Sequence, residues 1–134
     1  MKIFFLGISG TFMGNLAQMA SHLGHDVAGV DQKVYPPMSD ELAKSGISFK
    51  EGYTEENFQD ADIYILGNVI AKDNPLLIKI LSYEKNIMSG PEWLYESVLK
   101  DKKVIAVSGT HGKTTVTTMI AHALLEQGEN PGYL

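Results

Sequence analysis

Short apolar runs alternate with segments of helical periodicity along residues 3–99, and this alternation most constrains the fold. Strands that alternate with helices across short turns are typical of a doubly wound, Rossmann-like α/β domain, in which helices flank a parallel sheet. The pattern predicts strands at residues 3–6, 27–30, 47–49, 63–66 and 87–88. It predicts helices at residues 15–23, 39–44, 74–81 and about 90–99.

A glycine-rich turn over residues 7–14 joins the first predicted strand to the first predicted helix. A pyrophosphate can bind at this position, because N–H groups at the start of a helix point toward an anion. The spacing Gly-x-x-Gly-x-x-x-Gly is one residue longer in each gap than the NAD-binding form, so the nucleotide remains open. The candidate ligand-binding residues of the turn are Gly7, Ser9, Gly10, Thr11, Phe12, Met13 and Gly14.

Two polar residues follow other predicted strands at the edge where ligands of open α/β sheets bind. Asp31 ends the second strand, near the offset of about 20 residues expected for an acid that binds ribose. The alternative is that the glycines and Asp31 only shape a tight turn. Asn68 follows the fourth strand, where it either donates to a phosphate or a sugar or caps the turn.

A second phosphate-binding motif, Val-Ser-Gly-Thr-His-Gly-Lys-Thr-Thr, occupies residues 107–115. It lies between a predicted strand at 104–107 and a predicted helix at 113–127, which is the layout of a nucleoside-triphosphate loop. Lys113 can reach the outer phosphates, and a threonine hydroxyl can hold Mg²⁺. The loop is shorter than the strict Walker pattern, because Val107 stands where that pattern has its first glycine. Its candidate binding residues are Gly109, Thr110, His111, Gly112, Lys113, Thr114 and Thr115.

Composition limits the classes of partner that the 134-residue chain is expected to bind. The net charge of −5 argues against a broad nucleic-acid surface, and the lack of cysteine excludes disulfides and thiolate metal sites. The sequence shows neither a signal peptide nor a membrane span, so we expect a cytoplasmic protein with no membrane partner.

The motifs divide the chain into two predicted parts. Residues 1–100 would form the first domain, and residues 101–134 would be the strand, P-loop and helix that open a truncated second α/β domain. One strand and one helix cannot bury the apolar stripe of the last helix. We therefore expect that stripe to pack on the first domain, to mediate self-association or to stay exposed. It contains Val116, Met119, Ile120, Ala123 and Leu124.

With both glycine turns placed, the whole chain resembles the Mur ligase family, ATP-dependent enzymes that build peptidoglycan precursors. The residues that carry the resemblance are 7–14, Gly-Val-Asp at 29–31, and 108–115. Within the family, residues 34–39, 67–68, 74–75 and 89–94 look most like the members that join the tripeptide L-Ala-γ-D-Glu-meso-diaminopimelate during peptidoglycan recycling. The members that add L-alanine are the alternative.

The resemblance implies a substrate, cofactors and a mechanism. UDP-N-acetylmuramate would lie on the first glycine turn, with Asp31 near the nucleoside, and ATP–Mg²⁺ would lie on the second. The lactyl carboxylate would attack the γ-phosphate to form an acyl phosphate, which the amine of the tripeptide would then displace. Lys113 and Thr114 are the implied catalytic residues, because Lys113 neutralises charge on the transferred group and Thr114 binds Mg²⁺.

The sequence also departs from the family pattern after Leu134. The family's acid, histidine and carbamylated lysine of the second domain, and its third domain, have no counterpart in these residues. We therefore expect this polypeptide alone to bind the UDP-sugar but not to act as a ligase. A non-catalytic sugar-nucleotide-binding module and an NAD-binding oxidoreductase domain are the alternatives of other classes.

Overall fold

The computed structural model describes residues 1–133, and the chain divides into two compact units, Met1–Lys100 and Asp101–Leu134. The first unit contains all the strands of the described chain and most of its helices. The second unit contains one helix, α5 (Lys113–Glu126), preceded and followed by residues without regular structure.

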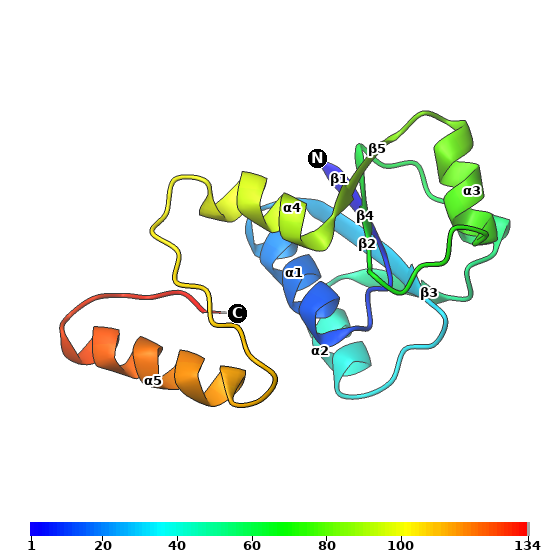
Figure 1. Ribbon diagram of the computed structural model, residues 1–134. Helices are drawn as coiled ribbons and strands as arrows, with labels where there is room; N and C mark the ends of the chain where they lie inside the picture. The colour runs from blue at the N-terminus through cyan, green and yellow to red at the C-terminus, as the bar shows by residue number, and fades with distance from the viewer. Residues whose placement is uncertain (134) are drawn as a thin grey trace. The chain divides into compact units, whose positions relative to one another are not determined.

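Five parallel strands form the sheet of the first unit, in the order β3-β2-β1-β4-β5 (Figure 1). They are β1 (Lys2–Leu6), β2 (Asp26–Asp31), β3 (Ser48–Glu51), β4 (Ile63–Leu66) and β5 (Asn86–Ser89). The central strand β1 pairs with β2 on one side and with β4 on the other. The strand order reverses at β1, and ligands of open α/β sheets bind beside the carboxyl ends of the strands at such a point.

Helices cover both faces of this sheet, which confirms the predicted Rossmann-like α/β fold. They are α1 (Thr11–His22), α2 (Met38–Lys44), α3 (Pro75–Ser82) and α4 (Gly90–Leu94), with two short helical turns, η1 (Glu55–Asn57) and the π-helical η2 (Tyr95–Leu99). Side chains of β1 alternate between the faces: Ile3 and Phe5 join the core under α1, α2 and α4, whereas Phe4 and Leu6 join the core under α3.

The first helix begins earlier than the sequence predicted. We expected a turn through Gly14 and a helix from residue 15, but α1 begins at Thr11 and includes Gly14. A Cβ atom on Gly14 would collide with the side chain of Met38, so this glycine allows close packing between α1 and α2. The glycine-rich turn itself therefore spans residues 7–10.

Asn74 caps the start of α3 and gives a test of the local fold. Its side-chain oxygen accepts hydrogen bonds from the N–H groups of Leu76 at 3.0 Å and Leu77 at 3.1 Å. We expect Asn74→Ala to lower the free energy of unfolding by about 1 kcal/mol, because these two groups lose their acceptor. Urea denaturation measures the change, with Asn86→Ala, at an exposed position in β5, as the control. An equal loss in both variants would contradict the capping role.

The second unit differs from the prediction at residues 104–107. We expected a strand there, but residues 103–109 have no regular secondary structure, so that prediction is wrong. A strand needs a neighbouring strand for its backbone hydrogen bonds, and among residues 101–133 the only regular element is α5. The predicted helix after the loop is present.

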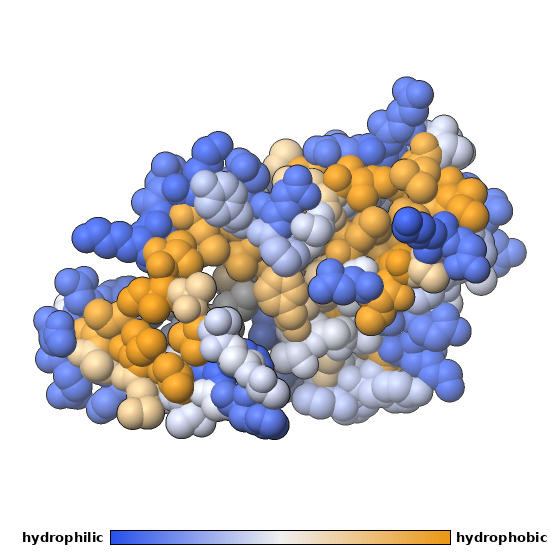
Figure 2. All heavy atoms as spheres, in the orientation of Figure 1, coloured by the Kyte–Doolittle hydropathy of each residue, from blue (hydrophilic) through white to orange (hydrophobic). Residues whose placement is uncertain are grey.

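Apolar side chains gather on the surface of α5, as Figure 2 shows. Val116 is 44% exposed, Met119 66% and Leu125 51%. Self-association through this helix stays a prediction. We expect sedimentation velocity to show a mass that increases with protein concentration, and a monomer at every concentration would contradict it.

Among the described residues, no helix is both long and apolar enough to cross a membrane.

Candidate functional site

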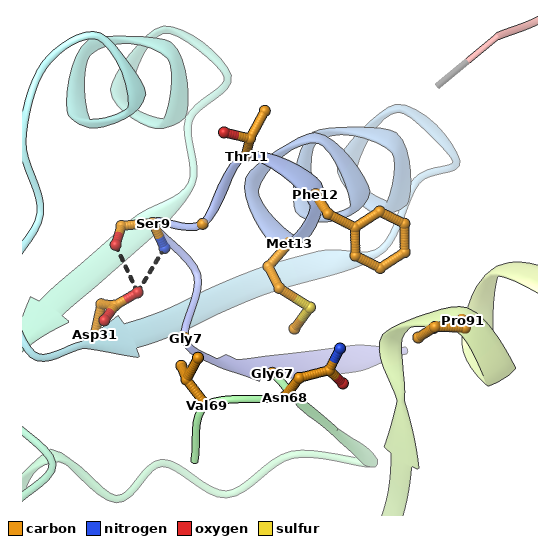
Figure 3. A pocket seen from close by; sticks show the side chains of 11 residues that line it. Gly7, Ser9, Thr11, Phe12, Met13, Asp31, Gly67, Asn68, Val69 and Pro91 are labelled. Atoms are coloured by element: carbon orange, nitrogen blue, oxygen red, sulfur yellow. Dashed lines mark hydrogen bonds between the residues drawn. The ribbon is translucent and has the colours of Figure 1, made fainter. Parts of the chain in front are cut away.

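A hollow of about 370 Å³ lies at the carboxyl ends of β1 and β4, at the point where the strand order reverses (Figure 3). Eight of the nine sequence-predicted residues of the first site lie around it, and Gly14 is the exception. The lining residues are Gly7, Ser9, Gly10, Thr11, Phe12, Met13, Asp31, Gly67, Asn68, Val69 and Pro91. The glycine turn and the polar residues of two other strand ends therefore meet at one place.

The glycine turn gives the hollow its shape. Gly7 has φ +86°, a left-handed conformation that a residue with a side chain rarely adopts. Its N–H donates to the carbonyl oxygen of Val30 at 2.8 Å, which ties the end of β1 to β2. The chain then turns at Gly10, the N-cap of α1, whose φ of −63° and ψ of +141° are extended. This geometry brings the start of α1 to the edge of the sheet.

The start of α1 is open. The first bond of the helix runs from the N–H of Gly14 to the carbonyl oxygen of Gly10, at 2.7 Å, and no side chain caps the helix. The N–H groups of Thr11, Phe12 and Met13 have no hydrogen-bond acceptor within residues 1–133. Three free N–H groups at the positive end of a helix dipole favour an anion such as a phosphate.

The two ends of the hollow differ in chemistry. Ser9 and Asp31 lie at one end, and Phe12 and Pro91 at the other (Figure 3). Phe12 is 38% exposed, so its ring offers an apolar surface next to the open helix start. Within the described residues Asn68 makes no side-chain hydrogen bond that would cap its turn, and its amide can bind a ligand.

Asp31 lies within a hydrogen-bond network at the polar end. One carboxylate oxygen accepts from the N–H of Ser9 at 2.8 Å and from its hydroxyl at 2.6 Å. The other accepts from the N–H of Gln32 at 2.7 Å and from the hydroxyl of Tyr53 at 3.0 Å. Burial, then the nearby charge of Asp31, raises the pKa of the Tyr53 phenol well above its usual range, so Tyr53 remains a donor.

The predicted binding residues did not include Gly67 and Val69, which flank Asn68, nor Pro91, which also lines the hollow, nor Tyr53, which bonds to Asp31. Tyr53 follows β3, and Pro91 lies in α4 after β5. Both therefore come from the carboxyl ends of strands, as Asp31 and Asn68 do. A position at the carboxyl end of a strand could have indicated both residues from the sequence. Their closeness to Asp31 and Asn68 is evident only once the strand order places β3 beside β2 and β5 beside β4.

The second predicted site lies in the second unit. Gly112 is the N-cap of α5 with φ +78°, and Lys113, Thr114 and Thr115 form the first turn of that helix. Thr110 and His111 form a bend before it. The ammonium group of Lys113 donates to the carbonyl oxygen of Gly109 at 2.7 Å, so the lysine lies over its own loop. A glycine with a left-handed conformation thus leads into the first turn of α5, and ATP binding at this loop stays a prediction.

Comparison with known proteins decides the family. Residues 2–102 match the model of the family described as "Mur ligase family, catalytic domain". The chain belongs to the Mur ligase family. It is 48% identical over 137 aligned residues to the UDP-N-acetylmuramate–L-alanyl-γ-D-glutamyl-meso-2,6-diaminoheptandioate ligase of Escherichia coli, covering 100% of this chain and 30% of that relative. Mur ligases act in peptidoglycan metabolism and are ATP-dependent.

Two further relatives refine this comparison. The chain is 36% identical to the UDP-N-acetylmuramate–L-alanine ligase of Rubrobacter xylanophilus, covering 98% of this chain and 29% of that relative. The crystal structure of the UDP-N-acetylmuramate:L-alanyl-γ-D-glutamyl-meso-diaminopimelate ligase from Neisseria meningitides matches with a TM-score of 0.92 and 43% identity. That match covers 99% of this chain and 42% of the other. The chain thus spans between 29% and 42% of the length of these Mur ligases.

Proposed function

We propose that the hollow of the first unit holds the diphosphate of UDP-N-acetylmuramate. The observation that carries the proposal is the open start of α1, whose three free N–H groups, of Thr11, Phe12 and Met13, lie at the hollow. These groups can bind the diphosphate without help from an arginine or lysine. Gly7 and Gly10 let the ligand approach the backbone closely, and Asn68 is placed to donate to a phosphate or to the sugar.

We propose further that the protein to which these residues belong joins the L-Ala-γ-D-Glu-meso-diaminopimelate tripeptide to that sugar. The higher identity to the E. coli tripeptide ligase, 48% against 36% for the L-alanine ligase of R. xylanophilus, supports the tripeptide as the amino substrate. The reaction would run through an acyl phosphate formed with ATP on residues 109–115. Bound Mg²⁺ would neutralise phosphate charge, and Thr114 would be one of its ligands.

A proline substitution tests the diphosphate site. Thr11→Pro removes one of the free N–H groups but keeps α1, because proline is favoured at the first helical position and Gly10 already has the extended conformation that precedes it. We expect UDP to bind about tenfold more weakly to this variant, because a charge-assisted hydrogen bond is lost. Isothermal titration calorimetry measures the affinity.

Thr11→Ala is the matched control, because it keeps the N–H and removes only the side chain. We expect its affinity for UDP to stay closer to that of the wild type. If both variants bind UDP as the wild type does, the helix start is not the diphosphate site.

Thermal unfolding in the presence of UDP or NAD tests which nucleotide binds. Protection by UDP but not by NAD would favour the sugar-nucleotide hypothesis over the oxidoreductase alternative.

We propose that residues 1–134 alone bind the UDP-sugar without ligating it. They span 30% of the E. coli relative, and no group of three metal-binding side chains lies together within residues 1–133. Lys113 must also leave the Gly109 carbonyl before it can reach a phosphate. We expect no release of phosphate from ATP when UDP-N-acetylmuramate and tripeptide are both present. Turnover at roughly 1 s⁻¹ or faster, an ordinary enzyme rate, would contradict the proposal.

A further inference from the structure

The carboxylate of Asp31 receives four hydrogen bonds from within the protein. Its donors are the N–H and hydroxyl groups of Ser9, the N–H of Gln32 and the hydroxyl of Tyr53, at 2.6 to 3.0 Å. A carboxylate has about four acceptor positions, so these bonds use its capacity. In dinucleotide-binding folds the acid at this position accepts a ribose hydroxyl. Here a ribose would first have to displace a donor of the protein.

Ser9 and Tyr53 reach Asp31 from opposite sides of β2, because Ser9 follows β1 and Tyr53 follows β3. β3 pairs with β2 but not with β1. A second contact ties the same segment down, because the N–H of Gly52 donates to the backbone carbonyl of Asp31 at 2.8 Å. The hydroxyl of Tyr53 would lie 3.8 Å from a Cβ on Gly7, so it is close to the turn itself.

Ser9 connects this network to the ligand side. Both its backbone N–H and its hydroxyl are bound to one oxygen of Asp31, and Gly10, the N-cap of α1, follows directly. The position of the Asp31 carboxylate therefore sets the position of the residue that leads into the open helix start.

We propose that Tyr53 is a positioning residue for the diphosphate site. It holds the Asp31 carboxylate, the carboxylate holds Ser9, and Ser9 fixes the turn from which the free N–H groups of α1 face the hollow. Asp31 acts as an internal clamp in this arrangement and does not accept from the ribose of the ligand. The diphosphate part of the inference rests on the function proposed above for the hollow.

The test compares Tyr53→Phe with Tyr64→Phe. Tyr64 is a matched control, because its hydroxyl also bonds within the protein, accepting from the N–H of Ala61 at 3.0 Å and donating to the carbonyl oxygen of Gln59 at 2.7 Å. Those partners precede β4, at the opposite edge of the sheet from the glycine turn. Both variants lose one hydroxyl, but only Tyr53→Phe releases the clamp.

Amide hydrogen exchange in the absence of ligand is the first readout. We expect the Ser9 amide to exchange about three- to tenfold faster in Tyr53→Phe than in the wild type, relative to the most protected strand amides, and to be unchanged in Tyr64→Phe. An unchanged exchange rate of the Ser9 amide in Tyr53→Phe would contradict the proposal that Tyr53 positions Ser9 through Asp31. This readout needs no ligand, so it decides the clamp even if the hollow binds no nucleotide.

The second readout compares inorganic pyrophosphate with UDP. A loosened turn weakens both ligands, so we expect Tyr53→Phe to reduce the two affinities by the same factor and Tyr64→Phe to reduce neither. If UDP binding falls while pyrophosphate binding is unchanged, Tyr53 and Asp31 contact the nucleoside directly, and the proposal is wrong. If the wild type binds neither ligand, the proposed function of the hollow fails, and with it the diphosphate role of Tyr53.

Discussion

Replacing Gly29 with alanine is expected to lower the free energy of unfolding by about 3 kcal/mol, near the upper end of what one added methyl group costs in a packed core. Gly29 lies in β2 opposite Phe5 of β1. A Cβ atom there would lie 2.6 Å from Cδ1 of Ile8, 3.0 Å from Cβ of Ile8 and 2.8 Å from the carbonyl oxygen of Phe5. The end of an isoleucine side chain can move, but the backbone of the central strand cannot move without loss of its pairing.

The same substitution should also impair the site. Ile8 is fully buried within the glycine turn, so a displaced Ile8 moves the residues that lead into α1. We expect Gly29→Ala to lose UDP binding even at temperatures where it stays folded. Urea denaturation and calorimetric titration measure the two effects. Gly132→Ala, which adds a Cβ where no atom lies within 4 Å, is the control, and an equally small effect at both positions would contradict the packing argument.

Asp31→Asn is expected to destabilise the first unit by about 2 kcal/mol, because partly buried donors lose a charged acceptor. Asparagine has almost the same shape, but its amide nitrogen cannot accept from the groups that now bond to that oxygen. It would face either the two donors of Ser9 or those of Gln32 and Tyr53. In either orientation, two of the four hydrogen bonds to this side chain are lost.

Asp60→Asn is the control for charge alone. Asp60 is exposed and pairs with Lys85 at 2.6 Å, and Lys85 lowers the pKa of Asp60. Exposed ion pairs add little to stability, so we expect a much smaller change than at Asp31. Urea denaturation of both variants at neutral pH compares them. If Asp60→Asn destabilises the chain as much as Asp31→Asn does, the Asp31 network contributes nothing specific.

The sequence was sufficient to predict the sheet, because strand and helix periodicities differ and a glycine or a polar residue ends each strand or directly follows it. It placed the start of α1 too late, since a glycine such as Gly14 indicates a turn unless its close contact with Met38 is known. It predicted a strand at residues 104–107 from local composition, whereas a strand also needs a partner. Both errors concern contacts between elements, which a local pattern does not contain.

The sequence predicted those residues of the candidate site that directly follow a strand. Ser9, Asp31 and Asn68 each follow a predicted strand, and all three line the hollow. Tyr53 was missed because its contact with Asp31 depends on β3 lying next to β2. The sequence also assigned Asp31 to the nucleoside, and that assignment stays a prediction. The hydrogen bonds that its carboxylate accepts become visible only when Ser9, Gln32 and Tyr53 are placed around it.

Calorimetric titration of the wild-type chain with UDP-N-acetylmuramate and, separately, with UDP is the most direct test of the proposed UDP-sugar site. We expect both ligands to bind at a single site, the sugar-bearing ligand more tightly, and Thr11→Pro to weaken the binding of both. Failure of the chain to bind either ligand would contradict the central claim that the hollow at the start of α1 holds the UDP-sugar of a Mur ligase.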